Sequence, residues 1–244
     1  YSRVQVARSV DPLTGKPIRM YATDPYFAQS AMFFDSDDLV FQYARFFDLI
    51  GHFNPHLNKT LLIGSGAFNY PKHYLAKFPA ATMDVVEIDP KAEEIAKSYF
   101  RWTENDRVKV IAKDGREFLN TSGPGQYDAV LLDAFGSLFS VPYQLTTLEA
   151  VRRMHDVLRD DGVVIANLGT AITGEGGRFL AAEVVTYRQV FPQVLLFKVR
   201  EDKSDSDVQN VILVALRSPD AAARKSAEPE TAALLDHFAR LKGL

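Results

Sequence analysis

The stretch at residues 61–89 constrains the fold more than any other part of the chain. An apolar run at 61–63 ends at the Gly-Ser-Gly turn of residues 64–66, and a second apolar run ends at Glu87-Ile88-Asp89. The pattern predicts a strand, a glycine turn, a helix and a second strand with an acid at its tip. Glycines let the backbone approach a ligand closely, and the acid can accept hydrogen bonds from ribose hydroxyls. The stretch therefore indicates an enzyme that uses an adenosine-containing cofactor.

The composition excludes several classes of function. With 244 residues, of which 47% are apolar, the chain can bury a sizeable core. The net charge of −3 and the pI of about 6.0 give no electrostatic basis for a nucleic-acid partner. The chain has no cysteine, so disulfides, cysteine-ligated zinc and thiol nucleophiles are excluded, and the cytoplasm is the default compartment.

The ends of the chain carry their own expectations. No apolar run approaches the roughly 20 residues that cross a bilayer, so we expect no membrane contact from this segment itself. The chain begins at Tyr1 in strand-like sequence, and we expect it to be a piece of a longer protein, such as the cytoplasmic domain of a membrane protein.

Three regions differ in pattern. Residues 1–35 alternate apolar and polar side chains around a turn at 11–15, which predicts a β-hairpin or small antiparallel sheet, and this region is a candidate homodimer surface. Residues 36–217 form the expected nucleoside-binding domain, which opens with a helix at about 37–52 capped by Asp35 or Ser36. Residues 218–244 are rich in alanine and charge, and we expect a helix or a tail.

From residue 59 onward, strand and helix patterns alternate, which predicts a parallel sheet covered on both faces. The expected strands are 60–64, 83–88, 107–111, 127–133, 162–167, 193–200 and 209–216, and the expected helices are 69–78, 90–100, 115–120, 143–159 and 176–191. The last two strands have a short connection, so they pair antiparallel. The predicted class is α/β, with a seven-stranded, mostly parallel sheet. At the level of the fold, this strand pattern resembles the Rossmann-like class I AdoMet-transferase type.

Acids follow the expected strands at their carboxyl ends, where open α/β sheets bind ligands. Glu87 and Asp89 point the same way, so we assign Glu87 to ribose and Asp89 to the helix start. Asp114, next to Gly115, can accept a hydrogen bond from an adenine amino group, cap the following helix, or do both. Asp133 ends the fourth strand, and we expect it to face the reactive part of the cofactor.

Structural alternatives stay open for these residues. The glycine turn can be an ordinary tight turn, the acids can be helix caps, and Asp133 can belong to a packed connection. Asn69 stands where a dinucleotide fingerprint has its third glycine, which disfavours a nicotinamide enzyme. The five histidines show no ligand spacing, so we expect no metal site.

Four segments together resemble the spermidine synthase family of polyamine aminopropyltransferases. They are LLIGSGAF at 61–68, VVEID at 85–89, the Asp114-Gly115 pair, and YDAVLLDAF at 127–135 with PYQLTTLE at 142–149. They are most similar to the spermidine synthase-like branch often fused to membrane transporter-like segments. The resemblance implies a small N-terminal β-domain, a Rossmann-like domain and decarboxylated AdoMet as the donor, with methylthioadenosine as the product. An amine acceptor attacks the carbon next to the sulfonium.

The resemblance also implies roles for single residues. Glu87 matches the ribose-binding acid, Asp114 the adenine-binding acid, and Asp133 the first acid of the family's D-S-S-D segment. Gln29 and Gln42 fall where the family has glutamines lining the cofactor site. The expected cofactor-binding residues are Gly64, Ser65, Gly66, Glu87, Asp114, Gly115, Gln29, Gln42 and Asp133, and Asp133 is also the expected catalytic residue.

Three positions depart from the family. Ala67 replaces an aspartate that holds the cofactor's amino group, Gly136 replaces the second acid of D-S-S-D, and Phe41 replaces a tyrosine that contacts the amine. Polyamine recognition needs carboxylates, and an attacking amine needs a base. The usual residues supply neither.

Three interpretations therefore stay open. The first is aminopropyl transfer with relocated acids, for which Asp133, Glu149 and Glu183 are candidates. The second is methyl transfer from intact AdoMet to a small acceptor. The third is a catalytically silent module that senses AdoMet or methylthioadenosine within a larger membrane-associated protein.

Overall fold

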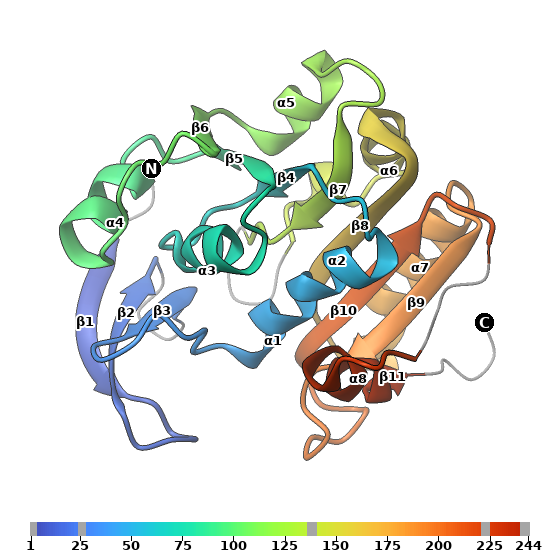
Figure 1. The fold of residues 1–244 in the computed structure, drawn as a ribbon. Coiled ribbons are helices and arrows are strands. Elements are labelled where there is room, and N and C mark those ends of the chain that lie inside the picture. Colours follow the sequence, from blue (N-terminus) through green and yellow to red (C-terminus); the bar gives the residue numbers. More distant parts are fainter. Residues whose placement is uncertain (1–3, 24–27, 136–140, 221–224, 240–244) are drawn as a thin grey trace.

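Two sheets form the framework of the molecule. The computed structural model describes residues 4–23, 28–135, 141–220 and 225–239. Figure 1 shows a large twisted sheet with helices on both faces, and a small antiparallel sheet beside it. The predicted α/β class with a mostly parallel central sheet is confirmed.

The small sheet contains β1 (Gln5–Val10), β2 (Pro17–Ala22) and β3 (Ser30–Phe33), paired antiparallel in that order. A tight turn joins β1 to β2, in which the Asp11 carboxylate accepts hydrogen bonds from the amide and hydroxyl of Thr14 at 3.0 and 2.5 Å. Gly15 supplies the positive φ of 71° that this turn needs. The predicted hairpin is confirmed, with β3 added to it.

The large sheet has the order β11-β9-β10-β8-β7-β4-β5-β6. Its strands are β4 (Lys59–Ile63), β5 (Thr82–Glu87), β6 (Val108–Ala112), β7 (Tyr127–Leu132), β8 (Leu158–Thr170), β9 (Gln193–Lys198), β10 (Gln209–Leu216) and β11 (Phe238–Ala239). Strands β4 to β8 are parallel, and β10 is antiparallel to both β8 and β9, as predicted for the last two long strands. The two-residue β11 is an eighth strand beyond the seven expected, and it pairs with β9.

The helices cover the sheet on both faces, as Figure 1 shows with α2 and α3 in front and α6 and α7 behind. They are α1 (Gln42–Arg45), η1 (Phe46–Asp48), α2 (Leu49–Phe53), α3 (Asn69–Lys77), α4 (Ala92–Tyr99), α5 (Gly115–Thr121), η2 (Tyr143–Leu145), α6 (Leu148–Val157), η3 (Glu175–Gly177), α7 (Arg178–Arg188) and α8 (Pro229–Asp236). Each described helix is too short or too polar to cross a bilayer.

The first helix begins later than the sequence predicts. We expected a helix from about residue 37 with Asp35 or Ser36 as its cap, and this is wrong, because Leu39 still forms an antiparallel bridge to Met32 of β3. The helix starts at Gln42, and its N-terminal neighbour Phe41 makes no side-chain cap. The helix expected at 143–159 is likewise divided into η2 and α6, with Thr147 capping α6.

The alternation of side chains along β4 places the core on both faces of the sheet. Leu62 packs on the face that carries Phe46, Phe47 and the helices α2, α3 and α4. Leu61 and Ile63 pack on the other face, against α5, α6 and α7. This period of two is what a central strand buried on both faces requires.

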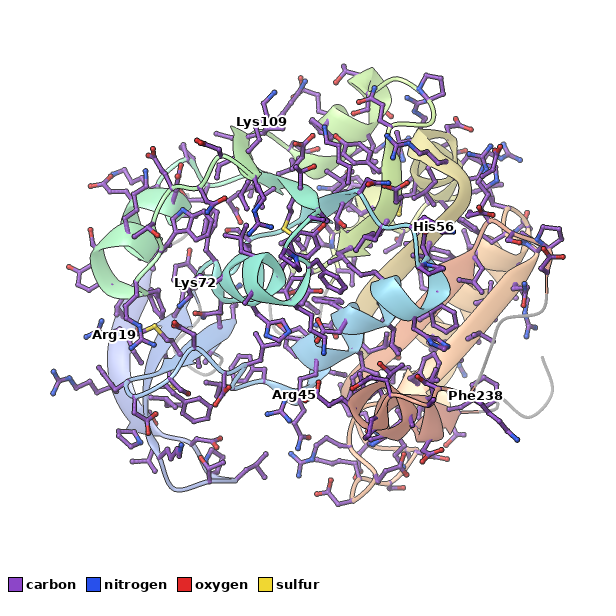
Figure 2. All side chains as sticks on the ribbon, in the orientation of Figure 1. Arg19, Arg45, His56, Lys72, Lys109 and Phe238 are labelled. Atoms are coloured by element: carbon purple, nitrogen blue, oxygen red, sulfur yellow. The ribbon has the colours of Figure 1, made fainter. Side chains whose placement is uncertain are left out.

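The small sheet is fastened to the large domain beside the glycine turn. Asn69 at the start of α3 donates to the Ser30 hydroxyl at 2.9 Å and to the Ala31 carbonyl at 3.1 Å. Lys72 on the same helix contacts the Met32 sulfur of β3 at 3.5 Å and forms an ion pair with Asp37, shortly after β3, at 3.2 Å. Figure 2 shows Lys72 on the side of α3 that faces the small sheet. These contacts place the small sheet next to the carboxyl ends of β4 and β5.

A buried acid on α7 makes the stability of the fold depend on pH. Glu183 is only 4% exposed, and burial raises the pKa of its carboxyl to about 7. The unfolded chain has the ordinary value near 4.5, so stability from the neutral carboxyl is complete below pH 4.5 and is lost as pH rises through about 7. We expect the free energy of unfolding of the wild type to fall relative to Glu183→Gln by roughly 3 kcal/mol across this window.

Denaturant unfolding at pH 4.5, 6 and 8 measures this difference. The exposed Glu94 on α4 gives the control Glu94→Gln, which makes the same chemical change at a solvent-exposed acid. A difference between Glu183→Gln and the wild type that stays constant with pH would contradict a neutral, buried carboxyl.

Candidate functional site

A cavity of about 870 Å³ lies at the carboxyl ends of the central strands. Its wall is formed by the small sheet, by α1, by the loops after β4, β5, β6 and β7, and by side chains on β8, on β10 and just after β9. Residues in its lining include Tyr21, Gln29, Phe41, Gln42, Tyr43, Gly64, Gly66, Glu87, Ile88, Asp89, Asp114, Gly115, Asp133, Asn167, Arg200 and Asn210. Eight of the nine expected cofactor-binding residues are in this set.

Two adjacent parallel strands, β4 and β7, meet at the centre of the cavity. Helices leave these strands in opposite directions along the sheet, toward β5 and toward β8, which makes this the topological switch point where α/β sheets bind ligands. The Asp133 amide donates to the Ile63 carbonyl at 2.9 Å. A Cβ atom at Gly64 would lie 2.4 Å from the Asp133 carbonyl oxygen, and Gly64 has a φ of +92°. Only glycine fits there without a shift of the backbone.

Glu87 is held in place by the glycine turn. One carboxylate oxygen accepts hydrogen bonds from the Ser65 amide at 2.9 Å and the Ser65 hydroxyl at 2.7 Å, and the other accepts from the Asp89 amide at 3.0 Å. Ser65 itself does not line the cavity, so we expect it to act through Glu87 rather than on a ligand. Asp89 accepts a hydrogen bond from the Lys91 amide at 2.9 Å and so supports the start of α4, as expected.

The Asp114-Gly115 pair occupies the start of α5. Asp114 caps the helix by accepting a hydrogen bond from the Glu117 amide at 2.9 Å, and it also lines the cavity. The capping alternative is confirmed, and binding of an adenine amino group by Asp114 stays a prediction. A Cβ atom at Gly115 would lie 2.5 Å from a methyl carbon of Ile63, so this glycine lets α5 approach β4 closely.

Asp133 lies in the cavity within a hydrogen-bonded cluster. Its carboxylate accepts from the Tyr43 hydroxyl at 3.1 Å and from the Asn167 side-chain amide at 2.9 Å. The Asn167 carbonyl oxygen in turn accepts from the Asn210 amide at 2.9 Å. Burial raises the pKa of Asp133 to about 6, while both hydrogen bonds act to lower it.

Sequence reasoning missed four residues of the site. Asn167 interrupts the apolar run of β8, and a buried amide in such a strand is a signal that could have identified it. Tyr43 and Asn210 carry no comparable signal. Ile88 is 67% exposed although apolar, and it lines the cavity between two acids.

The remaining residues expected at the site differ in whether they line the cavity. Gln29 and Gln42 both line the cavity. Glu149 lies exposed at the start of α6 and Glu183 on α7, and neither lines the cavity, so their candidacy as relocated acids is wrong. Gly136 lies outside the described residues.

Ala67 stands where the sequence resemblance predicts an aspartate. Its side chain is fully buried against Tyr21, Met32 and Phe100. Among the residues that the structure describes, no three histidine or acidic side chains are grouped closely enough to hold a metal ion.

The family follows from comparison with known proteins. A model of the spermine/spermidine synthase domain matches residues 45–198, which is more than half of the chain. The chain belongs to this family. A polyamine aminopropyltransferase of Vibrio vulnificus is 33% identical to it over 190 residues, which cover 77% of this chain and 60% of that protein. An N-terminal histidine N-methyltransferase of Emericella nidulans is 29% identical over 166 residues, 66% of this chain and 28% of the fungal protein.

Solved structures share the fold of this spermine/spermidine synthase-domain chain. A probable spermidine synthase from Corynebacterium glutamicum superposes with a TM-score of 0.77 at 19% identity, covering 96% of this chain and 85% of the other. Human methyltransferase-like protein 13, solved in complex with SAH, gives 0.60 at 22% identity, covering 80% and 87%. The chain spans 60% or less of the length of the first curated relatives that it matches.

The close contact at the switch point gives a test of the site's framework. Gly64→Ala places a methyl group against the Asp133 carbonyl at a positive φ, and we expect a loss of roughly 2–5 kcal/mol in the free energy of unfolding from strain and overpacking. Gly125→Ala is the matched control, because Gly125 has a φ of +61° but open space around it. It should cost about 1–2 kcal/mol.

Denaturant unfolding of both variants measures the two costs. Equal losses would show that the Gly64–Asp133 contact relaxes freely and does not constrain the cavity.

Proposed function

We propose that this chain is a transferase that binds a sulfonium nucleoside of the AdoMet type and transfers an alkyl group from it to an amine. The observation that carries this proposal is the arrangement of Glu87 and Asp133 in one cavity at the switch point. Glu87 is fixed toward the cavity by Ser65, and Asp133 is a buried carboxylate held by hydrogen bonds.

The end of the cavity at β5 and β6 suits a nucleoside. Glu87 would accept hydrogen bonds from ribose hydroxyls, and Asp114 keeps one carboxylate oxygen free of its capping bond for an adenine amino group. The exposed side chain of Ile88, next to Glu87 in the sequence, lines the same cavity and offers an apolar surface on which a purine ring can pack. The cavity of about 870 Å³ is large enough for a nucleoside and a second substrate together.

The charge of the cavity favours cationic ligands. Among the described residues that line it, the acids Asp11, Glu87, Asp89, Asp114 and Asp133 face a single basic side chain, Arg200. A sulfonium ion and a protonated amine both carry positive charge, and carboxylates in an enclosed site attract them strongly.

The chemistry needs alignment and one proton acceptor. The nitrogen of the acceptor attacks the carbon bonded to the sulfonium, the new C–N bond forms as the C–S bond breaks, and the electron pair of that bond leaves on sulfur as a neutral thioether. The attacking ammonium must first lose a proton. Asp133 is assigned as the acceptor of that proton, since its raised pKa of about 6 makes it more basic than an ordinary aspartate while it stays largely ionised at neutral pH.

The names of the relatives support nitrogen as the acceptor atom. One relative is named for aminopropyl transfer to polyamines and another for methyl transfer to an N-terminal histidine. The nucleoside product reveals which group this chain transfers, because aminopropyl transfer releases methylthioadenosine and methyl transfer releases S-adenosylhomocysteine. Mass spectrometry after incubation with each donor and with a diamine, a polyamine or a peptide with a free amino terminus is the deciding experiment. Absence of both products with every pair would favour the silent sensing module.

Removal of the proposed ribose contact should weaken nucleoside binding. We expect Glu87→Ala to lower the affinity for methylthioadenosine or S-adenosylhomocysteine by roughly 1–3 kcal/mol, because the ribose hydroxyls lose their acceptor in an enclosed site. Isothermal calorimetry measures the change, which corresponds to about 5- to 150-fold. Glu94→Ala, an exposed acid on the following helix α4, is the control and should bind as the wild type does. Unchanged affinity in Glu87→Ala would refute the ribose contact.

Removal of the proposed base should impair turnover and spare nucleoside binding. We expect Asp133→Asn to lower kcat by about 10²- to 10⁴-fold, the usual contribution of a general base. The dissociation constant for methylthioadenosine should stay within about threefold, which is below 1 kcal/mol. The rate of product formation tests the effect on kcat, and titration calorimetry tests the effect on the dissociation constant. Loss of methylthioadenosine binding itself would mean that Asp133 is a nucleoside ligand and not the base.

A further inference from the structure

Asp133 is reached by side chains from three separate elements. Tyr43 approaches from α1, Asn167 from β8, and Asn210 reaches Asn167 from β10. Each carboxylate oxygen of Asp133 accepts one of the two direct hydrogen bonds, at 3.1 Å and 2.9 Å. A carboxylate with both oxygens held in this way cannot rotate without losing a bond in a site of low dielectric.

The donors are themselves fixed. The Tyr43 ring packs against Phe41 and Phe47, with ring centroids 6.0 Å away in each case. Burial and the nearby Asp133 raise the pKa of the Tyr43 hydroxyl well above its usual value, so it stays protonated and donates. Asn167 is only 1% exposed, and Asn210 fixes its orientation by donating to its carbonyl oxygen, which leaves the amide nitrogen for Asp133.

Other charged groups share the cavity with this cluster. They are Asp11, Glu87, Asp89, Asp114 and Arg200. Burial sets the upward direction of the pKa of Asp133, and the hydrogen bonds from Asn167 and Tyr43 oppose it. Tyr43 is the titratable group in direct contact with it among the described residues, since Asn167 and Asn210 are neutral.

We propose that Tyr43, Asn167 and Asn210 are positioning residues for Asp133, which hold its carboxylate ionised and in one orientation as the proton acceptor of the transfer. This role rests on the proposed function for the identity of the reaction, while the hydrogen-bonded cluster itself does not depend on it. All three residues act through Asp133. In the reaction, the acceptor ammonium passes a proton to the free lone pair of the Asp133 carboxylate, and the neutral amine then attacks the sulfonium carbon.

The variant Tyr43→Phe removes one hydroxyl and keeps the ring in its aromatic contacts. A hydrogen bond to the ionised form lowers the pKa of a carboxyl, so its loss raises the pKa of Asp133. From the wild-type value of about 6, we expect an upward shift of about one unit. Activity depends on ionised Asp133, so the acidic limb of the pH profile of kcat/KM moves to higher pH by the same amount. At pH 6 the variant loses more activity than at pH 8.

A direct titration keeps this test independent of turnover. NMR of protein labelled with ¹³C at the aspartate carboxyls, with the Asp133 signal assigned by its loss in Asp133→Asn, reports the same shift in the absence of any substrate. If the protein turns over no sulfonium nucleoside but the titration moves as expected, the cluster holds and the proposed function fails. If turnover occurs and neither the titration nor the pH profile moves, the positioning role fails.

Two further variants complete the design. Tyr70→Phe is the matched control, because it removes another hydroxyl that donates to a carboxylate, here Asp48 at 3.3 Å, away from the cavity. It should leave the titration of Asp133 and the pH profile unchanged. Asn210→Ala frees Asn167 to reorient, so it should shift the Asp133 signal in the same direction as Tyr43→Phe. An unshifted signal in Asn210→Ala would remove Asn210 from the cluster.

Discussion

The hydrogen bond from the Asp133 amide to the Ile63 carbonyl, beside the contact at Gly64, is the constraint on which the site depends. It joins the ends of β4 and β7 where their helices diverge, so the glycine turn and Asp133 face one cavity. The Gly64 amide donates to the Val86 carbonyl at 2.9 Å and brings the end of β5 into the same arrangement. The carboxyl ends of β4, β5 and β7, which are up to 70 residues apart in sequence, are therefore joined by these two backbone hydrogen bonds. Since the cavity has its acids at these ends, its chemistry follows from this pairing of strands.

The conformation of the glycine turn depends on the packing of Phe68 as well as on the glycines. Phe68 adopts a φ of 58°, a left-handed conformation that is uncommon for a bulky residue. Its side chain is fully buried and lies 4.9 Å from the Trp102 ring, and its amide donates to the Ser65 carbonyl. A strained backbone conformation of this kind persists only where the surrounding packing and hydrogen bonds stabilise it by more than the strain costs. The turn then presents the Ser65 amide and hydroxyl to Glu87, so the backbone conformation sets the direction of that carboxylate.

Much of the fold could be predicted from the sequence because the strands of the large sheet are short apolar runs, several of which end at acids or glycines. The seven long strands and the Gly-Ser-Gly turn at 64–66 follow from such local patterns. The late start of α1 could not be predicted, since it depends on the bridge between Leu39 and Met32 of another element. The hydrogen-bond partners of Asp133 could not be predicted for the same reason, because Tyr43 lies 90 residues away in sequence and Asn167 lies 34 away. Local patterns locate a carboxylate at a strand end, but its donors come from tertiary packing.

Packing explains why position 67, where the sequence resemblance predicts an aspartate, holds an alanine. Ala67 is fully enclosed by Tyr21, Met32 and Phe100, and the Tyr21 and Phe100 rings meet edge to face at 6.1 Å. A carboxylate in that apolar cluster would be buried without a partner, which is strongly unfavourable. The small sheet, which contributes Tyr21 and Met32, therefore packs in a way that needs a small apolar residue at the glycine turn. The alanine at position 67 is thus coupled to the way the two sheets meet. Among the acids that line the cavity, Glu87 and Asp133 each have both carboxylate oxygens held by hydrogen bonds, so their orientations do not depend on residue 67.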